Sequence, residues 1–364
     1  MATAPPEQQQ QQPPSLTFPR PIFAAVSPHP FLQAHLSANK KVAIRANGRT
    51  EHMFRKPGIN TGSLTHANGS AVVRLGNTSV VCGVRAEVLR EEDVPGTNEF
   101  HVPTSLDTPT EEADGEDEDD SEEIDTLRLV VPNVELSTGS TPSHIPGNAP
   151  SSTQQSLITR LRSLILSTRL LRASDLRILY KPSLNALDAD ADDEAQIVVK
   201  AYWVLYVDIF FISIDGSAFD AAWMSLLAAL RDTKLPRAWW DEEFEGILCS
   251  DAPEEAKRLR LRGFPVAATF AVLEGGNEIG AEGEDEKGEW ILSDPDAFEE
   301  SVCRESVTVV VDGEWEKGGK GAMVRRIEKS GGGVVGREGE EGMRTVIRRA
   351  AGRWRDVKSV MEGE

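Results

Sequence analysis

Three arginines near the start of the chain, Arg45, Arg49 and Arg55, have the chemistry to bind phosphate groups. The planar guanidinium group carries its donors in a fork that pairs with two phosphate oxygens at once. A carboxylate fits the same fork, so Arg49 and Arg55 have a second interpretation, in which they anchor their own loop through local ion pairs. The residue types leave both interpretations open.

A second place with potential chemistry is the turn Asp215-Gly216-Ser217-Ala218-Phe219, which separates an apolar segment from an apolar helical pattern. The exposed N–H groups and the dipole of a helix N-terminus favour an anion at such a place. Here, however, Phe219 offers an aromatic ring and Asp220 adds a negative charge to the first turn. We therefore predict that Asp215 ends a strand and that Ser217 is the N-cap of the helix.

No residue pattern indicates catalysis. No Ser/His/Asp or Cys/His constellation stands out along the chain. The six histidines form no i, i+4 pair and the three cysteines no C-x-x-C pair, so metal-ligand spacing is absent. The sequence therefore predicts no catalytic residue, no metal and no cofactor.

Strands are predicted between the three arginines and the turn at residues 215–219, and also after that turn. Residues 57–88 have the pattern of a three-strand antiparallel meander, with two-residue turns at Asn68-Gly69 and Gly76-Asn77. Residues 127–136 return to strand character, with Pro132 restricting them to an edge or a strand end.

The most apolar segment, residues 197–214, is predicted to be a strand buried on both faces, because its apolar residues show little alternation. A second antiparallel meander follows at residues 263–328, with a hairpin turn at Asp312-Gly313. Its expected strands are 264–273, 289–292, 306–311 and 322–328.

Apolar residues at helical spacing predict helices at 152–173, from 219 to 230 and at 340–361, with a short helix at 31–36. In the first of these, four arginines lie mostly opposite the apolar stripe, and we interpret them as solvated or paired with acidic neighbours. The order of strands and helices fits an α+β domain with mixed and antiparallel sheets packed on helices.

Acidity is concentrated in one stretch. Residues 91–125 hold sixteen Asp and Glu and no Lys or Arg, so removing them from a net charge of −20 leaves −4 for the rest of the chain. We predict that this stretch is a solvated acidic insertion, followed by two smaller ones at about 186–195 and 276–288. Residues 1–37 are expected to be a disordered Pro/Gln-rich tail ending in the short helix, and residues 38–362 a single domain.

Membrane and secretory segments are not expected. The run from Ala201 to Ile214 is too short to cross a bilayer and contains Asp208. No basic and apolar leader opens the chain. Three scattered cysteines favour a reducing compartment without a disulfide framework.

Several segments resemble the RNase PH family. They are Gly69-Ser70-Ala71 with Leu75-Gly76-Asn77-Thr78-Ser79-Val80, and Arg45-Ala46-Asn47-Gly48-Arg49 with Phe54-Arg55, which is similar to the family's R-x-D-G-R and E-F-R segments. The run Val81-Cys82-Gly83-Val84-Arg85-Ala86-Glu87 is most like the branch of non-catalytic exosome ring subunits. The chain departs from the family pattern at Asn47 and at Met53.

The resemblance implies an RNase PH-like fold, similar to ribosomal protein S5 domain 2, and it gives the two sites a meaning. In active members a D-G-G-T-R-like turn holds the attacking phosphate, and here Ala218 and Phe219 replace the Thr and Arg. Active members also place a carboxylate on the strand matching residues 264–273, whereas this segment contains no Asp or Glu, and Thr269 cannot act as a general acid. The turn is therefore interpreted as a degenerate phosphate site, and Arg45, Arg49 and Arg55 as candidates for the RNA path.

The resemblance further implies a structural subunit of the RNA exosome core ring that supports 3′–5′ RNA processing and degradation, including rRNA maturation and mRNA decay. Expected partners are the other RNase PH-like ring subunits, an S1-domain cap subunit and RNA in the assembled channel, without a membrane. The expected location is the nucleus and nucleolus, and also the cytoplasm.

Two alternatives make different predictions. An active phosphate-dependent 3′–5′ exoribonuclease would release nucleoside diphosphates from RNA only when inorganic phosphate is present. A free-standing RNA-binding adaptor would be a monomer whose affinity for RNA falls steeply with salt.

Overall fold

The computed structural model describes residues 19–39, 42–94, 116–142, 144, 151–181, 197–275, 289–313, 321–332 and 340–363. The side chains of residues 116–120 lie outside the description.

The larger sheet has six strands in the order β1-β2-β3-β6-β4, with β5 pairing on β6 beside β4. All pairs are antiparallel except β4 with β6, which is parallel. The strands are β1 (Pro57–Thr61), β2 (Gly69–Leu75), β3 (Thr78–Arg90), β4 (Val130–Leu136), β5 (Arg177–Tyr180) and β6 (Val198–Ser213).

The smaller sheet is antiparallel, with four strands in the order β12-β11-β13-β14. These are β11 (Val266–Glu274), β12 (Glu289–Ser293), β13 (Glu305–Asp312) and β14 (Met323–Ser330). Two short ribbons join β7 (Lys234–Leu235) to β10 (Lys257–Arg258) and β8 (Ala238–Asp241) to β9 (Gly246–Cys249).

The helices are α1 (Arg20–Val26), α2 (Pro28–Ser37), α3 (Glu116–Thr126), α4 (Ser152–Ser167), α5 (Ala218–Asp232), α6 (Ala297–Val302) and α7 (Glu340–Glu362), with short 3-10 turns at Glu91–Asp93, Ala173–Asp175 and Pro253–Glu255. A reciprocal capping box starts α4, since Ser151 Oγ accepts from Gln154 N and Gln154 Oε1 accepts from Ser151 N.

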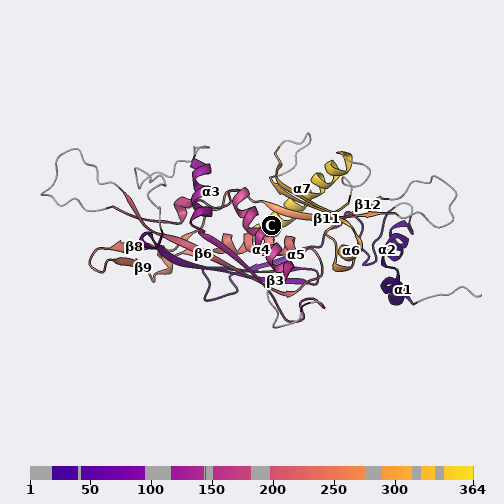
Figure 1. Ribbon diagram of the computed structural model, residues 1–364, viewed down its shortest axis with the longest axis horizontal. Coiled ribbons are helices and arrows are strands. Elements are labelled where there is room, and N and C mark those ends of the chain that lie inside the picture. The colour runs from indigo at the N-terminus through magenta and orange to yellow at the C-terminus, as the bar shows by residue number, and fades with distance from the viewer. Residues whose placement is uncertain are drawn as a thin grey trace, which may run out of the picture.

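Helix α5 lies at the centre of the molecule because it is apolar all round. Every residue from Phe219 to Leu230 is buried, and the helix contacts β2 and β3 of the larger sheet and β11 of the smaller one. On the other face of the smaller sheet, α7 packs against β13 and β11 (Figure 1). The predicted α+β class is confirmed, and α5 is the layer between the two sheets.

The expected two-residue turn at Asn68-Gly69 is wrong. The link between β1 and β2 spans residues 62–68, and Asn68 instead accepts from Ala86 N through its Oδ1 atom (2.9 Å). Gly69 is needed for close approach rather than for a turn, because a Cβ there would lie 2.5 Å from Ala229 O. At Gly76-Asn77 the two-residue turn is confirmed.

Two other strand predictions need correction. In β6 both faces are buried only around residues 201–205, and beyond them Asp208, Phe210 and Ile212 are exposed on one face. The expected hairpin turn at Asp312-Gly313 is also wrong, since Asp312 pairs with Met323 and the connection is therefore ten residues long. The period-2 alternation in the second half of β6 is hard to see in the sequence because two of these three exposed side chains, Phe210 and Ile212, are apolar.

Part of the acidic stretch is folded, contrary to the prediction of a solvated loop. Residues Glu116–Thr126 form α3, and Glu123 and Ile124 near its end are fully buried. The carboxylate of Glu123 accepts two hydrogen bonds from Arg177 on β5. The remainder of that insertion, at 95–115, and the insertions at 186–195 and 276–288 lie outside the described residues.

The leading segment is more ordered than predicted. In place of one short helix at 31–36 there are two, α1 and α2, and Leu32 and Leu36 of α2 pack against Leu273 and Leu292 of the smaller sheet. Residues 1–18, expected to be a disordered tail, lie outside the described residues. No helix in the described part of the chain is both long and apolar enough to cross a membrane.

Candidate functional site

The three arginines singled out from the sequence converge on one corner, where β12 leads into α6. Arg45 is fully buried and its guanidinium lies 3.2 Å from the carboxylate of Glu299, while it also donates to the carbonyl oxygens of Glu51 (2.8 Å) and Ser293. Burial lowers the pKa of Arg45 to about 10, although the charge of Glu299 opposes this shift. Arg45 therefore stays a cation in a dry site, with its donors directed at its own chain.

Arg55 and Asp294 form the strongest pair of this corner. Asp294 accepts from the backbone N (2.8 Å), Nε (2.9 Å) and Nη2 (2.6 Å) of Arg55. Arg49 adds a contact of 3.3 Å to the same carboxylate. Burial alone would raise the pKa of Asp294, but the hydrogen bonds and charge of Arg55 outweigh it and the pKa is lowered. Asp294 is thus a buried anion held by two guanidinium groups.

The same Arg55 side chain reaches the turn at residues 215–219. Its Nη1 donates to Asp215 O (2.7 Å), so the arginine loop, the β12–α6 corner and the turn meet at one point. Asp215 ends the segment after β6, as expected, and its Oδ1 accepts from Ala297 N at the start of α6 (3.3 Å). Gly216 has a φ of 71°, and a Cβ there would lie 2.4 Å from Pro295 O.

Ser217 stands at the N-cap position of α5 but does not cap it, so the predicted side-chain role is wrong. Its φ is 47°, and its hydroxyl donates to Pro295 O (3.1 Å) instead of accepting from the helix. The left-handed backbone turns the hydroxyl away from the first turn of the helix. In the sequence, an N-cap serine is identified by its residue type alone. The loss of the cap at Ser217 depends on its left-handed backbone, which the residue type does not indicate.

A carboxylate from the chain itself occupies the N-terminus of α5. Glu300 of α6 accepts a hydrogen bond from Ser217 N, with 2.7 Å between Oε1 and N. Burial, with a smaller contribution from the charge of Asp220, raises the pKa of Glu300 to about 7 against the effect of the Ser217 hydrogen bond. The place where a helix N-terminus would receive an external anion is therefore filled by Glu300.

Phe219 contributes to this closure. It is buried, and the guanidinium carbon of Arg160 lies 3.9 Å from its ring centroid. That guanidinium is held at the same time by Glu328 at 2.6 Å. The guanidinium group of Arg160, close to the turn, is therefore already in contact with the ring of Phe219 and the carboxylate of Glu328.

Asp220 sits behind Phe219 in the first turn of α5 and is directed toward β11. Its carboxylate accepts from Thr269 N (2.8 Å) and from Thr269 Oγ1 (2.7 Å), and Thr269 Oγ1 is also 2.9 Å from Thr308 Oγ1. Burial raises the pKa of Asp220 to about 6, against the effect of the two hydrogen bonds. The site thus contains a buried acid, Asp220, but the hydrogen bonds from Thr269 hold its carboxyl group between α5 and the smaller sheet.

This geometry predicts an unusual pH dependence of stability. Because native Asp220 binds its proton more tightly than the unfolded chain, its contribution to stability falls as the pH rises from about 4 to about 6, by about 3 kcal/mol at most. Denaturant unfolding of the wild type and of Asp220→Asn at pH 4.5 and pH 7 tests this. The free energy of unfolding at pH 7 minus that at pH 4.5 should be less negative in the variant, because the variant lacks the titrating group.

Glu299 and Glu300 also have raised pKa values, and the charge of Asp220 contributes to the shift at Glu300, so the difference between the two proteins reports Asp220 together with its effect on Glu300. An identical pH dependence in the wild type and in Asp220→Asn would contradict the assignment.

Sequence reasoning missed the acidic half of this cluster. Asp294, Glu299 and Glu300 were not singled out, although Asp296 and Glu299 have the spacing of a capping box, which the structure confirms at the start of α6. Arg353 of α7 was missed too, and it donates to Arg55 O (2.7 Å) while nearly buried. The capping-box spacing was the available signal, but it indicates a helix start rather than a partner for distant arginines.

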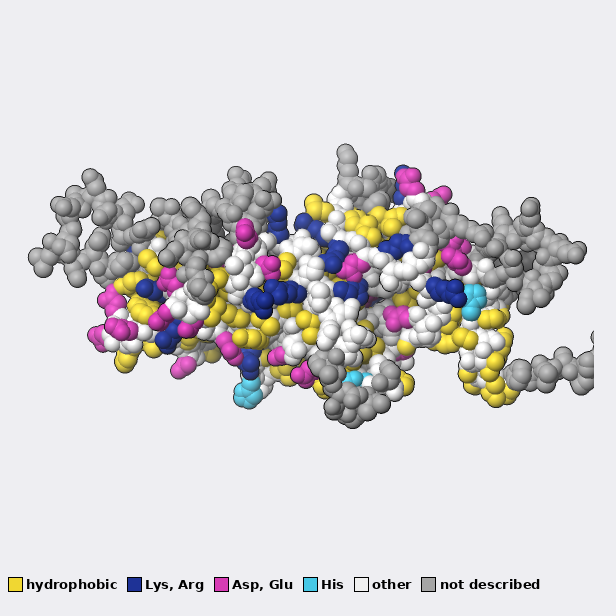
Figure 2. Space-filling model, in the orientation of Figure 1, with side chains coloured by type: hydrophobic (Ala, Val, Ile, Leu, Met, Phe, Trp, Pro, Cys, Tyr) yellow, Lys and Arg dark blue, Asp and Glu magenta, His cyan; other side chains and the backbone are white. Residues whose placement is uncertain are grey.

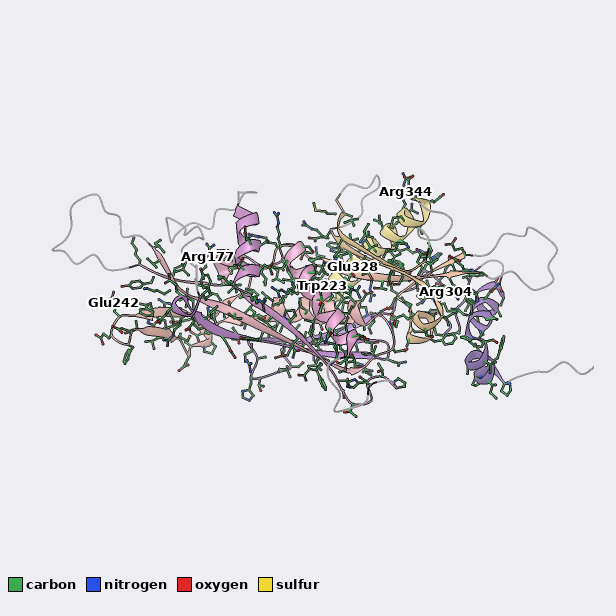
Figure 3. All side chains as sticks on the ribbon, viewed as in Figure 1. Arg177, Trp223, Glu242, Arg304, Glu328 and Arg344 are labelled. Atoms are coloured by element: carbon green, nitrogen blue, oxygen red, sulfur yellow. The ribbon has the colours of Figure 1, made fainter. Side chains whose placement is uncertain are left out.

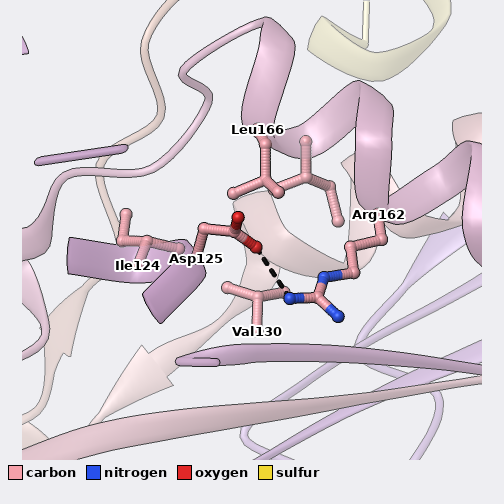
Figure 4. A pocket seen from close by; sticks show the side chains of 6 residues that line it. Ile124, Asp125, Val130, Arg162 and Leu166 are labelled. Atoms are coloured by element: carbon pink, nitrogen blue, oxygen red, sulfur yellow. Dashed lines mark hydrogen bonds and ion pairs between the residues drawn. The ribbon is translucent and has the colours of Figure 1, made fainter. Parts of the chain in front are cut away.

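Other kinds of site are not supported in the described part of the chain. No group of three or more His, Cys, Asp or Glu residues could hold a metal ion. A small hollow between α3 and α4 is lined by Ile124, Asp125 and Arg162, with Arg162 paired to Asp125 at 2.7 Å (Figure 4). About 10 Å³ of this hollow is open to a water-sized molecule, which is room for about one water and too little for a small-molecule ligand.

The chain was compared with known proteins. The model of the 3′ exoribonuclease family, domain 1, matches residues 53–236, which is half of the chain. Among curated proteins, the chain is 29% identical over 299 residues to the exosome complex component rrp43 of Schizosaccharomyces pombe, covering 82% of this chain and 85% of that protein. It is 27% identical over 286 residues to the exosome complex component Rrp42 of Methanothermobacter thermautotrophicus, covering 77% and 81%.

Two solved structures have a similar fold. A chain of the Archaeoglobus fulgidus exosome with RNA bound to the active site gives a TM-score of 0.59 at 22% identity, covering 93% of this chain and 98% of that one. A chain of an archaeal exosome core gives a TM-score of 0.56 at 22% identity, covering 95% and 100%. At this identity the likeness concerns the fold, and it agrees with the two sheets around α5.

Proposed function

The chain belongs to the 3′ exoribonuclease family, the RNase PH family, and from that premise we propose that it is a non-catalytic structural subunit of an RNA exosome core ring. The relatives named exosome complex components support the assembly. Within the branch of ring subunits, the run at residues 81–87 is most like ribosomal RNA-processing protein 43, and the similarity to rrp43 of Schizosaccharomyces pombe agrees with this. In this role the chain holds partner subunits and forms part of the RNA channel for 3′–5′ processing and degradation, including rRNA maturation and mRNA decay.

One observation carries the non-catalytic part of the proposal, namely the occupied N-terminus of α5. Glu300 accepts the Ser217 N–H at 2.7 Å, and Phe219 is covered by Arg160. An incoming phosphate would have to displace a carboxylate and would gain no arginine from the turn. On β11, the residue facing this corner is Thr269, whose hydroxyl group is too weakly acidic for general acid catalysis, and the acid that contacts it, Asp220, is buried and held by two hydrogen bonds from Thr269.

The three arginines are proposed to shape the RNA path by holding the loop at residues 42–56 in place. Their burial supports this role, since the side chains of Arg45, Arg49 and Arg55 are 0%, 14% and 10% exposed. Arg49 has the most exposed guanidinium of the three and is the best placed to contact RNA directly.

The proposed partners are the other RNase PH-like ring subunits, an S1-domain cap subunit and RNA within the assembled channel. We also propose a single domain over residues 38–362, extended by the packing of α2 on the smaller sheet. The proposed location is the nucleus and nucleolus, and also the cytoplasm, where exosome complexes process RNA.

A phosphorolysis assay tests the proposed lack of catalysis. The complex purified through this chain should not release nucleoside diphosphates from a single-stranded RNA when inorganic phosphate is added, because no site on the chain receives the phosphate. A phosphorolytic family member serves as the positive control. Phosphate-dependent release that disappears on substitution within residues 215–220 would favour the alternative, an active phosphate-dependent exoribonuclease.

A further inference from the structure

The hairpin formed by β8 and β9, residues 238–249, turns an apolar face outward at one end of the molecule (Figure 1). Trp239 and Leu248 are cross-strand neighbours on that face, and Trp239 is 38% exposed. Phe244 at the tip is 74% exposed, more than any other large hydrophobic residue in the described part of the chain. Single exposed apolar residues are normal on a protein surface, whereas apolar side chains gathered on one element mark an interaction site.

Packing within the chain accounts for the opposite face of this hairpin. Ala238 and Ile247 pack against the main core, and the ammonium group of Lys200 lies 5.2 Å from the ring centroid of Trp240. Because side chains alternate along a strand, these residues point away from the face that carries Trp239. The hairpin is therefore fixed to its own chain on one side and apolar on the other.

The tip of the hairpin is held by hydrogen bonds. Asp241 Oδ1 accepts from the backbone N of Glu243 (2.9 Å) and from that of Phe244 (3.0 Å). The hydroxyl group of Tyr180 on β5 donates to Glu242, which Figure 3 shows at this end of the molecule. A turn that is already held loses little conformational freedom when a partner binds, so its aromatic side chain is suited to be an anchor residue.

Acidic side chains surround Phe244 and indicate the charge of its partner. The cations over the two tryptophan rings of the hairpin are Lys200 and Arg237, and Glu255 lies 3.9 Å from Arg237. Together with the hairpin these residues hold five carboxylates and two cations, a net charge of −3. The hairpin itself contains no Lys or Arg and four acids, Asp241, Glu242, Glu243 and Glu245.

This acidity belongs to the tip and not to the base of the hairpin. The base is nearly balanced, with Lys234, Lys257 and Arg258 of the ribbon β7–β10 against Asp251 and Glu254. On the face of the molecule drawn in Figure 2, Asp and Glu side chains lie beside apolar ones at the end where β8 and β9 are found. An incoming molecule therefore meets an aromatic ring within a set of negative charges.

We propose that the β8–β9 hairpin docks on another subunit of the complex, where Phe244 enters an apolar hollow rimmed by Lys and Arg. The inference rests on the proposed function, because that function supplies the neighbouring subunits. An aromatic anchor at the centre of charged residues has the arrangement of an interface hot spot, and its carboxylates select a partner of opposite charge. RNA does not fit this surface, since its phosphate backbone would be repelled by the four acids.

The anchor is tested on the complex purified through the full-length chain. The measured quantity is the concentration at which half of the chain has left the complex on dilution, followed by native mass. Phe244→Ala should raise this concentration at least tenfold, as expected for the loss of a hot-spot aromatic residue. The denaturant midpoint of the chain should not change, because Phe244 is exposed.

Val26→Ala is the control for this change. Val26 is 70% exposed and lies on α1, at the opposite end of the molecule from the hairpin (Figure 1). It removes exposed apolar surface without touching the proposed anchor, so the variant should dissociate at the wild-type concentration.

The charges around the anchor are tested separately. Glu243→Lys with Glu245→Lys should weaken the association at least tenfold, because like charges then face each other, and should reduce the weakening that added salt causes in the wild type. The matched control is Glu87→Lys with Glu92→Lys, two exposed acids with the same change of charge. The control pair should leave both quantities near their wild-type values.

Photocrosslinking identifies what Phe244 contacts. With benzoylphenylalanine at position 244, the crosslinked peptide should come from another subunit of the complex and contain Lys or Arg next to apolar residues. A crosslink to RNA or to a second copy of this chain would overturn the proposal, as would the absence of any crosslink. Dissociation of both hairpin variants at the wild-type concentration would overturn it too.

Failure of the proposed function is recognised in the wild type. If the wild-type chain copurifies with no other subunit, that function fails and the inference fails with it. If the complex is present and the hairpin variants hold it as tightly as the wild type, the inference alone fails.

Discussion

Replacing Asp294 with alanine is expected to destabilise the protein by about 3–5 kcal/mol, because the change removes one partner of a buried ion pair and leaves the other uncompensated. Asp294 is 1% exposed and accepts three hydrogen bonds from Arg55, and Arg49 lies 3.3 Å from it. Without the carboxylate, these two guanidinium groups, whose side chains are only 10% and 14% exposed, can regain little of their hydration. The arginine loop, the β12–α6 corner and the turn before α5 would lose their shared anchor.

Denaturant unfolding of the purified chain measures this effect. Asp251→Ala is the control, since Asp251 is exposed and its loss should change the free energy of unfolding by no more than about 0.5 kcal/mol. Asp294→Asn should fall between the two, because the amide keeps an acceptor but loses the charge. Equal stability of Asp294→Ala and Asp251→Ala would show that the cluster does not hold this corner together.

The second large effect is expected at Glu123, in the only part of the long acidic stretch that the structure describes as helix. Glu123 is fully buried, accepts from both Nε and Nη2 of Arg177, and also bonds the hydroxyl group of Tyr202. Glu123→Ala should cost about 3 kcal/mol, at the lower end for a broken buried pair, because it leaves one guanidinium group without its carboxylate, whereas the loss of Asp294 affects two.

The neighbouring residue provides the control for this prediction. Glu122 is exposed, so Glu122→Ala removes the same charge from the same turn of α3 without removing a buried partner. Unfolding free energies and the rate of limited proteolysis near α3 should distinguish the two variants. The same loss of stability in both would mean that net charge, rather than the Glu123–Arg177 pair, determines how α3 is held.

The fold was predictable where the pattern is local. The apolar face expected for the last helix is confirmed in α7, with Val346, Ala350, Trp354 and Val357 buried and Met343, Ile347 and Met361 partly so. Helical periodicity needs only the neighbouring residues, and packing on the smaller sheet agrees with it. The two-residue turn at Gly76-Asn77 was predictable for the same reason, because its positive φ is a local requirement.

Predictions that depended on distant partners were wrong or incomplete. Asn68-Gly69 has the sequence of a tight turn. Glycine is needed at position 69, however, because Ala229 and Thr233 at the end of α5 lie too close to leave room for a Cβ atom. The acidic stretch has the composition of a loop, yet Ile124 and the Glu123–Arg177 pair fix its end as a helix. Composition and local spacing contain no information about contacts made across such separations.

The candidate site shows the same limit. The sequence identified Arg45, Arg49 and Arg55 and the turn at residues 215–219, and the structure brings them together. Their carboxylate partners Asp294 and Glu299 lie about 240–250 residues away from the arginines in the chain, so neither pairing could be predicted. An arginine that pairs with such a carboxylate anchors the chain, whereas an arginine without one can bind phosphate, so the distinction depends on a residue that is distant in the sequence.

The central claim, membership of a hetero-oligomeric exosome ring without catalysis of its own, is tested most directly by the native mass of the complex purified through this chain at its normal level in cells. We predict a complex containing one copy of this chain together with several related RNase PH-like chains and an S1-domain cap subunit. A monomer, or a ring built only from copies of this chain, would contradict the account and would return the turn at residues 215–219 to consideration as an active site.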